Sequence, residues 1–350
     1  MTSLVFPSSS CFMNTGFSYK LLKWFDVNKR DLPWRNINDP YPIWLSEIIL
    51  QQTRIQQGTD YWQRFVSRWP NEESLAKATE DEVLREWQGL GYYSRARNLH
   101  VAAKQIVELG KFPDTIKDIK SLKGVGDYTA AAIASFAFNI PVAAVDGNVY
   151  RVLARHFGID TPIDSVQGKK VFAELAQDLL PQKHPADFNQ AMMDFGAIQC
   201  TPHSPRCDSC PMIDTCDALR TQRVNSLPVK TNKVKIRERK FYYYYIRYQT
   251  NSQKFIALRK RPAGDIWQGL WEPLMIEDNP KIPDFKGSVT LMCQNVKHVL
   301  THQVIFADCY LVQTNEKPKI AADFIWIEEN EIDSYALPRL VELLVSQLPE

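Results

Sequence analysis

The chain has 350 residues, of which 45% are hydrophobic and 23% charged, and its formal net charge is +2 at pH 7. These values are ordinary for a globular protein of about two domains. A net charge this small cannot by itself attract nucleic acid. A nucleic-acid-binding surface, if there is one, must therefore be a local basic patch. The longest apolar run, 129–138, is far shorter than the roughly 18 residues of a membrane helix, so no membrane association is expected.

The first residues, "MTSLVFPSSSCFM", contain no basic segment followed by a long apolar one. The sequence therefore predicts no signal peptide and a cytoplasmic protein, associated with the nucleoid if the source is a bacterium. Helical patterning begins only after Met13, which makes Met13 an alternative start to Met1.

From Ser18 to Arg220 apolar residues recur at three- and four-residue spacing, and the connections carry Pro, Gly or Asp. The pattern predicts an all-α domain over 14–220. The expected helices cover 19–28, 42–57, 61–69, 81–90, 96–109, 127–138, 148–158, 169–180 and 188–200.

Residues 221–239 are basic and poor in large apolar side chains, which predicts an interdomain linker. Beyond it the period changes to that of short, aromatic and β-branched strands, followed by a closing helix. We therefore expect a smaller α+β domain over 240–350. Its predicted strands cover 240–248, 254–262, 305–314 and 323–329, and its helix covers 337–348.

Four of the seven cysteines fall within 17 residues, in the pattern C-x6-C-x2-C-x5-C. Without an export signal such a cluster favours a metal site over disulfides. Four thiolates suit zinc or a [4Fe–4S] cluster, and zinc fingers more often pair two CxxC knuckles than carry the single one seen here. The candidate ligands are Cys200, Cys207, Cys210 and Cys216.

Gly124 and Gly126 flank Val125 in a turn between two expected helices. The N–H groups of such a turn and of the following helix N-terminus can hold a phosphate without reading sequence. The alternative is a tight hairpin in which a glycine only caps the first helix.

Two carboxylates are candidates for acid and charge chemistry. Asp146 precedes the helix 148–158 and could simply cap it, which would keep it ionised. Glu47 lies among Trp44, Leu45, Ile48 and Ile49, and apolar surroundings raise the pKa of a carboxyl group and suit it to act as an acid.

The string "LKGVGDYTA" resembles the helix-hairpin-helix motif of a superfamily of DNA base-excision glycosylases. That superfamily also carries a loop aspartate some twenty residues later, here Asp146, and in one branch a four-cysteine loop with a [4Fe–4S] cluster, here 200–216. The resemblance covers Ser18 to Arg220. It implies an all-α helix-hairpin-helix glycosylase domain in which Asp146 stabilises the sugar cation and Asn148 orients it.

"PYPIWLSEIILQQTR" is similar to the motif W-x-S-E-x-x-L-Q-Q-T of the adenine glycosylase branch, the MutY type. The resemblance implies that Glu47 protonates adenine. Glycosylases that also cut the strand have a lysine at the position of Tyr128, and a tyrosine cannot form their Schiff base. Tyr128 therefore argues for base removal alone, supporting the sugar intermediate; otherwise it is a packing aromatic.

Further positions match the family's DNA-contacting residues. Tyr92 in "GLGYYSRARNLH" would wedge into the base stack, with Leu90 beside it and Gln52 assisting, because a flipped base leaves a space to fill. The positions matching the adenine pocket are Arg30, Leu32, Trp34, Arg35 and Gln190.

The stretch "LRKRPAGDIWQGLWEPL" resembles the core of a Nudix-like domain. No Glu-rich R-E-x-x-E-E helix follows to hold magnesium, so this domain is expected to bind rather than hydrolyse. In the family it recognises 8-oxoguanine through a loop reading Phe-Ser-His. Here "VLTHQ" supplies Thr301 and His302, which keeps a hydroxyl but departs from the motif.

Together these observations predict a monomeric, monofunctional DNA glycosylase that acts on double-stranded DNA containing adenine opposite 8-oxoguanine or guanine. Three alternatives stay open: an endonuclease III-like glycosylase/lyase for oxidised pyrimidines, a Nudix hydrolase with an accessory helical domain, and a non-catalytic helix-hairpin-helix DNA-binding protein. Tyr128 and Glu47 speak against the first, and the missing metal box speaks against the second.

Overall fold

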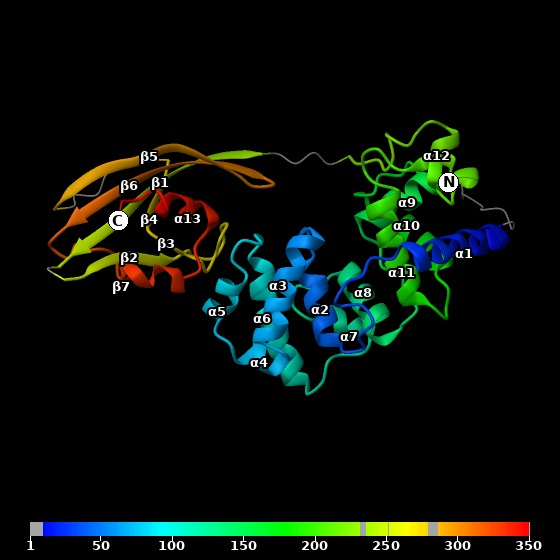
Figure 1. The fold of residues 1–350 in the computed structure, drawn as a ribbon, viewed down its shortest axis with the longest axis horizontal. Coiled ribbons are helices and arrows are strands. Elements are labelled where there is room, and N and C mark those ends of the chain that lie inside the picture. The colour runs from blue at the N-terminus through cyan, green and yellow to red at the C-terminus, as the bar shows by residue number, and fades with distance from the viewer. Residues whose placement is uncertain (1–9, 232–235, 251, 279–285, 350) are drawn as a thin grey trace. The chain divides into compact units, whose positions relative to one another are not determined.

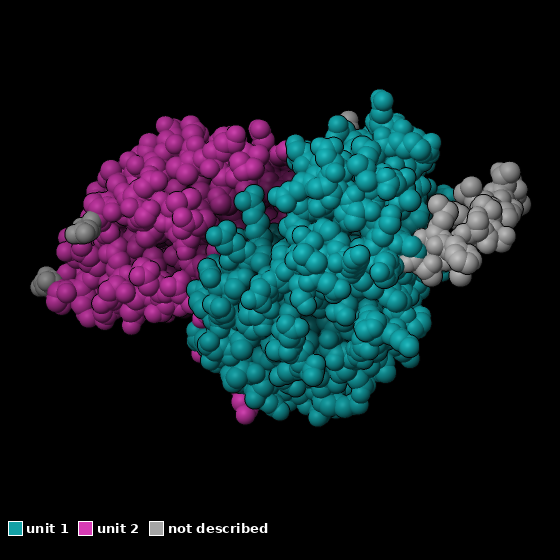
Figure 2. Space-filling model, turned by 45° about the vertical axis from the view of Figure 1, so that its right-hand side comes forward, with its two compact units in different colours: residues 1–76, 101–232 teal, residues 77–100, 233–350 magenta. Residues whose placement is uncertain are grey.

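The computed structural model describes residues 10–231, 236–250, 252–278 and 286–349. It divides into two compact units (Figures 1 and 2). Unit 1 comprises Met1–Ala76 and Val101–Asn232, and unit 2 comprises Lys77–His100 and Lys233–Glu350. In the described part of the chain, no helix is both long enough and apolar enough to span a bilayer.

Unit 1 is helical, as its periodicity predicts. A π-helix, Phe195–Gln199, follows α11 (Pro185–Asp194) directly, and two short 3₁₀ turns lie in the cysteine loop, Cys207–Ser209 and Ile213–Thr215. The α-helices are α1 (Ser10–Asn28), α2 (Pro40–Ile49), α3 (Ile55–Arg68), α4 (Glu72–Lys77), α7 (Ile116–Ser121), α8 (Asp127–Phe138), α9 (Gly147–Phe157), α10 (Val166–Leu179), α11 (Pro185–Asp194) and α12 (Asp217–Arg220).

The core beside the cysteine loop joins α1, α9, α10 and α11, which lie together in Figure 1. Its fully buried side chains include Leu21, Leu153, Phe172 and Phe188. Burying side chains of this size contributes about 1.5–3 kcal/mol each. This core therefore holds rigid the two helices, α9 and α11, that contribute to the site described below.

The prediction of a single helix over 42–57 is wrong, because the structure has two helices there. The chain leaves the helix after Ile49, Thr53 N–H bonds back to the carbonyl of Leu50 at 3.1 Å, and Gln52 adopts a left-handed φ of 58°. A new helix, α3, starts at Ile55 and takes in the segment expected as a separate helix over 61–69. No Gly or Pro marks this break, so periodicity alone runs through it.

The first part of the predicted linker 221–239 is not a free connection, because it packs on unit 1. Leu227 is buried, and its carbonyl accepts a hydrogen bond from Arg155 Nε at 3.2 Å. Thr231 N–H donates to the carboxylate of Asp164 at 3.1 Å. The last three residues of the segment, 237–239, already belong to the first strand of unit 2.

Unit 2 includes α5 (Glu80–Glu86) and the beginning of α6 (Ser94–Leu109), which were expected in the helical domain. Lys260 Nζ pairs with the Asp81 carboxylate at 2.9 Å, and Arg97 Nη1 donates to the carbonyl of Gln268 at 2.5 Å. These contacts explain why residues 77–100 group with the C-terminal part of the chain.

The rest of unit 2 is a mixed sheet in the order β3-β2-β1-β6-β5, with β4 paired to β1 and β7 to β2. Only the β1–β6 pair is parallel among these. The strands are β1 (Arg237–Gln249), β2 (Lys254–Lys260), β3 (Trp271–Glu272), β4 (Leu274–Glu277), β5 (Ser288–Val299), β6 (Gln303–Thr314) and β7 (Phe324–Glu328).

Helix α13 (Arg339–Val345) covers one face of this sheet, where Leu340 and Leu344 join a core with Tyr243 and Ile305. The predicted α+β organisation is therefore confirmed. Strand β5 was not predicted: its apolar alternation is short, being interrupted at Met292–Cys293 and again at Gln294–Asn295, and its side chains are exposed or half-buried.

Candidate active site

Helix α2 carries Glu47 into the interior of unit 1. The helix starts at Asp39, whose carboxylate accepts Tyr41 N–H at 2.9 Å, and continues with a proline in its first turn. Its residues 43–49 are all buried, so this short helix has no solvent face for its one acid. Glu47 is consequently only 8% exposed.

Two further elements bring Tyr128 and Asp146 to the same place. Tyr128 is the second residue of α8, and its hydroxyl donates to Glu47 Oε2 at 3.0 Å. Asp146 caps α9: its Oδ1 accepts Val149 N–H at 2.8 Å and its Oδ2 accepts the Asn148 amide at 2.7 Å. The cap that the sequence suggested therefore exists, and it leaves Asp146 facing the same cavity as Glu47.

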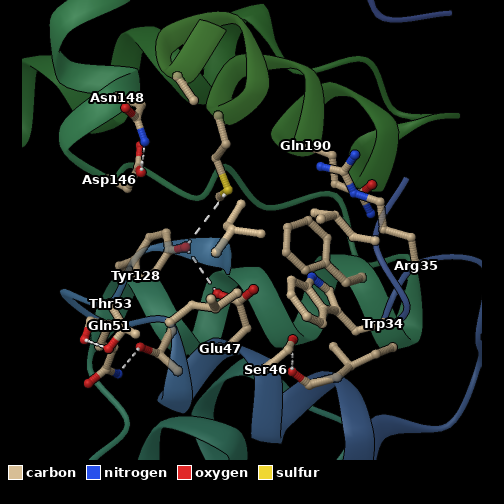
Figure 3. Close-up of a pocket in the computed structure, with 18 of the residues that line it drawn as sticks. Trp34, Arg35, Ser46, Glu47, Gln51, Thr53, Tyr128, Asp146, Asn148 and Gln190 are labelled. Carbon is tan, nitrogen blue, oxygen red and sulfur yellow. Dashed lines mark hydrogen bonds between the residues drawn. The ribbon is translucent and has the colours of Figure 1, made fainter. Parts of the chain in front are cut away.

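Figure 3 shows this cavity, into which Glu47 and Tyr128 point from one side and Asp146 and Asn148 from the other. Its volume is about 910 Å³, which is ample for a nucleobase. Its lining includes these expected residues: Arg30, Leu32, Trp34, Arg35, Glu47, Gln52, Gly126, Tyr128, Asp146, Asn148 and Gln190.

The electrostatics of the two carboxylates differ. The pKa of Glu47 is raised to about 7, chiefly because burial removes it from water; Asp146 adds to the rise, while Tyr128 and Arg35 oppose it. Burial also raises the pKa of Asp146, but hydrogen bonds from Val149 N–H and Asn148 lower it. Asp146 accepts several hydrogen bonds, which favour its ionised form, whereas Glu47 accepts one from the Tyr128 hydroxyl. The pair can therefore supply one acid and one carboxylate near neutral pH.

Arg151, which lies behind Asn148, was not predicted from the sequence. Asn148 Oδ1 accepts from Arg151 Nη2 at 2.8 Å, and the same arginine donates to the carbonyls of Gly196 at 2.7 Å and Cys200 at 2.8 Å. Arg151 lies one helical turn after Gly147, so only the helix period could have indicated that it points back to the cap.

Leu32 and Trp34 are buried side chains in the segment before α2, and Gln190 reaches the cavity from α11. Arg30 and Arg35 both donate to the buried carboxylate of Asp194, Arg35 with distances of 2.9 Å from each of its terminal nitrogens. Asp194 was not predicted as a site residue, because a single acidic residue near the end of a helix forms no recognisable sequence motif. Other cavity residues that it missed are Ser46, Gln51, Tyr150 and Met193.

The glycine turn joins α7 to α8 as expected. Gly124 has φ 81°, a left-handed value that favours glycine, and Val125 between the two glycines is buried. Gly126 is the N-cap of α8; no side chain bonds the first turn of the helix there, and space lies open around its Cα. Val125 N–H donates to the carbonyl of Leu122 at 3.1 Å, and a helix N-terminus without a side-chain cap is, in general, favourable for an anion.

Leu90, Tyr92, Thr301 and His302 all belong to unit 2 and do not line the cavity. Tyr92 is 42% exposed at a left-handed φ of 48°, and its hydroxyl hydrogen-bonds the Thr301 hydroxyl. Leu90 is half-buried, and Thr301 and His302 are exposed in the turn between β5 and β6. The structure thus brings the expected wedge and part of the expected lesion loop together.

The four loop cysteines are all free thiols of intermediate exposure. Burial raises the pKa of Cys210 to about 11, and the charges of Cys200, Cys216 and Cys207 contribute to that rise, so the four sulfurs are neighbours. Nevertheless, within the described ranges no three His, Cys, Asp or Glu side chains are arranged as a metal site. As a donor set, four adjacent thiols suit iron or zinc.

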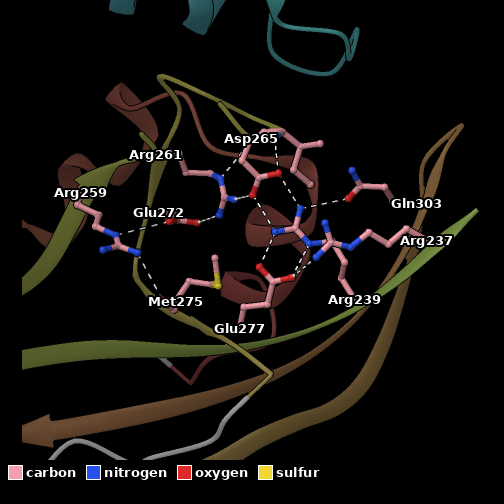
Figure 4. A network of polar contacts seen from close by, with 10 residues as sticks. Arg237, Arg239, Arg259, Arg261, Asp265, Glu272, Met275, Glu277 and Gln303 are labelled. Atoms are coloured by element: carbon pink, nitrogen blue, oxygen red, sulfur yellow. Dashed lines mark hydrogen bonds and ion pairs between the residues drawn. The ribbon is translucent and has the colours of Figure 1, made fainter. Parts of the chain in front are cut away.

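Figure 4 shows the polar network at the Nudix-like core of unit 2. Arg239 donates to Glu277 and Asp265, each at 2.7 Å, and Arg261 donates to the buried Glu272 at 2.7 Å. All three carboxylates are therefore already neutralised by guanidinium groups. The network is therefore a set of paired charges rather than an open acidic site.

The chain is similar to known DNA-repair proteins and to a NUDIX domain. Residues 45–182 match the family described as "HhH-GPD superfamily base excision DNA repair protein", and residues 243–347 match the NUDIX domain. A structure entitled "Structure of a thermostable thymine-DNA glycosylase" is similar with 31% identity and a TM-score of 0.57, over 61% of this chain and 100% of that one.

Two relatives carry the same curated name. "Adenine DNA glycosylase" of Buchnera aphidicola subsp. Baizongia pistaciae is 31% identical over 95% of this chain and 96% of its own length. "Adenine DNA glycosylase" of Mus musculus is 43% identical over 61% of this chain, which spans 44% of the mouse protein. With a relative matched along nearly its whole length and a base-excision domain around the cavity, the chain belongs to the adenine DNA glycosylase family.

Proposed function

We propose that this protein hydrolyses the N-glycosidic bond of adenine opposite 8-oxoguanine or guanine in double-stranded DNA and leaves an abasic site. The single observation that carries the proposal is Glu47, an acid with a pKa of about 7, which shares one cavity with Asp146 and Tyr128. A base-removing enzyme needs a proton for the leaving base and a negative charge beside the sugar cation.

In the proposed mechanism the protonated Glu47 carboxyl donates to a ring nitrogen of the flipped adenine, so that the base leaves as a neutral molecule. The sugar then carries positive charge, which the Asp146 carboxylate stabilises. A water molecule adds to the charged sugar carbon and loses a proton, which gives the abasic site. Asn148 orients Asp146 through its 2.7 Å hydrogen bond. Tyr128 is hydrogen-bonded to Glu47 and lies at the cavity, where its phenol can support the sugar intermediate without covalent chemistry.

We also propose which residues contact the DNA. The Gly124–Gly126 turn would hold a phosphate, and Tyr92, with Leu90 and Gln52, would fill the space of the flipped base. Thr301 and His302 would contact the base opposite adenine. We further infer that the glycosylase domain of 14–220 and the lesion-recognition domain of 240–350 act in one monomer, which is cytoplasmic, and associated with the nucleoid if the source is a bacterium.

An end-labelled duplex with one adenine opposite 8-oxoguanine tests this function under single turnover. We expect the labelled adenine strand to break only after hot alkali, because hydrolysis leaves an abasic site and Tyr128 offers no amine. A duplex with adenine opposite thymine is the control and should stay intact. Breakage without alkali would indicate a lyase nucleophile, and activity only on oxidised pyrimidines would favour the endonuclease III-like alternative.

We also propose that Cys200, Cys207, Cys210 and Cys216 hold a [4Fe–4S] cluster. The neighbouring free thiols and the single CxxC knuckle support it. Such a cluster would be held away from the cavity, since none of the four cysteines lines it. Its contribution would be to fix the loop against the core of α1, α9, α10 and α11, into which Cys200, Cys210 and Cys216 pack.

Anaerobically purified protein is therefore expected to contain about four iron and four labile sulfide per chain. Cys210→Ser should lower the iron content and the melting temperature together, because a bound metal group adds folding free energy. Cys309→Ser, at a buried thiol of the unit 2 sheet, is the matched control and should keep the iron. Stoichiometric zinc without iron would contradict the assignment.

A further inference from the structure

The cavity wall that faces Glu47 contains a buried charge cluster formed by Asp194 with Arg30 and Arg35. Asp194 is the last residue of α11 and is 0% exposed. Its carboxylate accepts the backbone N–H of Arg30 at 3.1 Å, Arg30 Nε at 2.8 Å, and Arg35 Nη1 and Nη2 at 2.9 Å each. Arg30 Nη2 also donates to it.

The hydrogen bonds to Asp194 do not use all the N–H groups of the two arginines. Arg35 Nη1 donates to both Asp194 and the carbonyl of Arg30, the latter at 2.7 Å, and the guanidinium lies 5.5 Å from the centre of the Phe25 ring; Arg35 Nε donates no hydrogen bond to the described residues. A guanidinium carries five N–H donors in a fixed plane. Because both side chains line the cavity, the remaining donors are available to acceptors on a bound base, such as adenine N7.

The charges also have a consequence for the acid. Arg35 lowers the pKa of Glu47, because a nearby positive charge favours the carboxylate. Asp194 offsets one of the two positive charges of the pair. Without it the cavity would carry a larger positive charge, and Glu47 would give up its proton at a lower pH.

We propose that Asp194 is a positioning residue for adenine excision: its buried carboxylate fixes the Arg30 and Arg35 guanidinium groups at the cavity wall and limits their positive charge toward Glu47. The residue touches the two arginines rather than the base. The inference rests on the proposed function and adds to it a base-recognition device that spans the segment before α2 and the end of α11.

The test is the pH profile of single-turnover adenine excision by Asp194→Asn in the full-length protein. Asparagine keeps the shape but removes the charge. We expect the fall in rate on the alkaline side to move to lower pH, and the rate at pH 6 to drop by about tenfold to a hundredfold because misplaced groups are costly in catalysis. Arg35→Gln should move the alkaline fall in the opposite direction, to higher pH.

Asn189→Ala on the same helix is the matched structural control. Asn189 is buried and bonds Ala144 N–H at 3.0 Å and Ser135 Oγ at 2.9 Å, and it does not line the cavity. This variant should lose stability without moving the alkaline fall. A fall that stays in place in Asp194→Asn would make Asp194 merely structural and overturn the inference.

If Asp194→Asn does not fold, the test rests on Arg35→Gln. In that variant, an alkaline fall in rate at the wild-type pH or at a lower pH would also overturn the inference. Failure of the proposed function is distinguishable from both results. In that case the wild-type protein itself would release no adenine.

Discussion

Asp146→Asn is expected to abolish adenine release while the protein still binds a duplex with a mispaired adenine. The substitution removes the negative charge that would stabilise the sugar cation but keeps a side-chain oxygen for Val149 N–H, so α9 stays capped. Loss of one preorganised electrostatic group costs about 10²–10³ in rate, and a full charge beside a cation is a demanding case. Single-turnover excision and fluorescence anisotropy on the same duplex measure the two properties separately.

The matched control is Asp39→Asn, because Asp39 also caps a helix of unit 1 but does not line the cavity. Asparagine is an equally good N-cap, so this variant should keep both excision and binding. Loss of binding together with excision in Asp146→Asn would point to a structural role of the cap. Unchanged excision would remove Asp146 from the mechanism.

The sequence predicts those features that depend on local pattern. The helical period gives most of unit 1, and the glycine pair gives the turn before α8. Glu47 could be identified as a perturbed acid because its own helix is apolar around it, and the structure gives it a pKa of about 7. In each case the information lies within one turn or one helix.

Features that depend on tertiary contacts could not be predicted. The break between α2 and α3 at Gln52 has no Gly or Pro, and the strand β5 has an interrupted apolar pattern on exposed and half-buried positions. Asp194 is about 160 residues from its arginines in the sequence, so nothing local marks it as their partner. The grouping of residues 77–100 with unit 2 likewise depends on long-range ion pairs such as that of Lys260 with Asp81.

Glu47→Gln is expected to slow adenine excision by about 10²–10⁴, which is the range that a positioned general acid contributes. Glutamine retains an oxygen to accept the Tyr128 hydroxyl, so the geometry of the cavity should hold. The pH dependence follows from the sign of the shift: the acid must be protonated, and its pKa is about 7. The wild-type rate should therefore be level below pH 7 and fall about tenfold per pH unit above it.

Single-turnover rates from pH 5.5 to 9 measure both effects, and Glu47→Gln should lose the alkaline fall along with the rate. Glu73→Gln, at an exposed acid in the first turn of α4, is the control and should reproduce the wild-type profile. A rate that rises through pH 7 would mean that the ionised carboxylate is the active form, so that Glu47 works as a base on water.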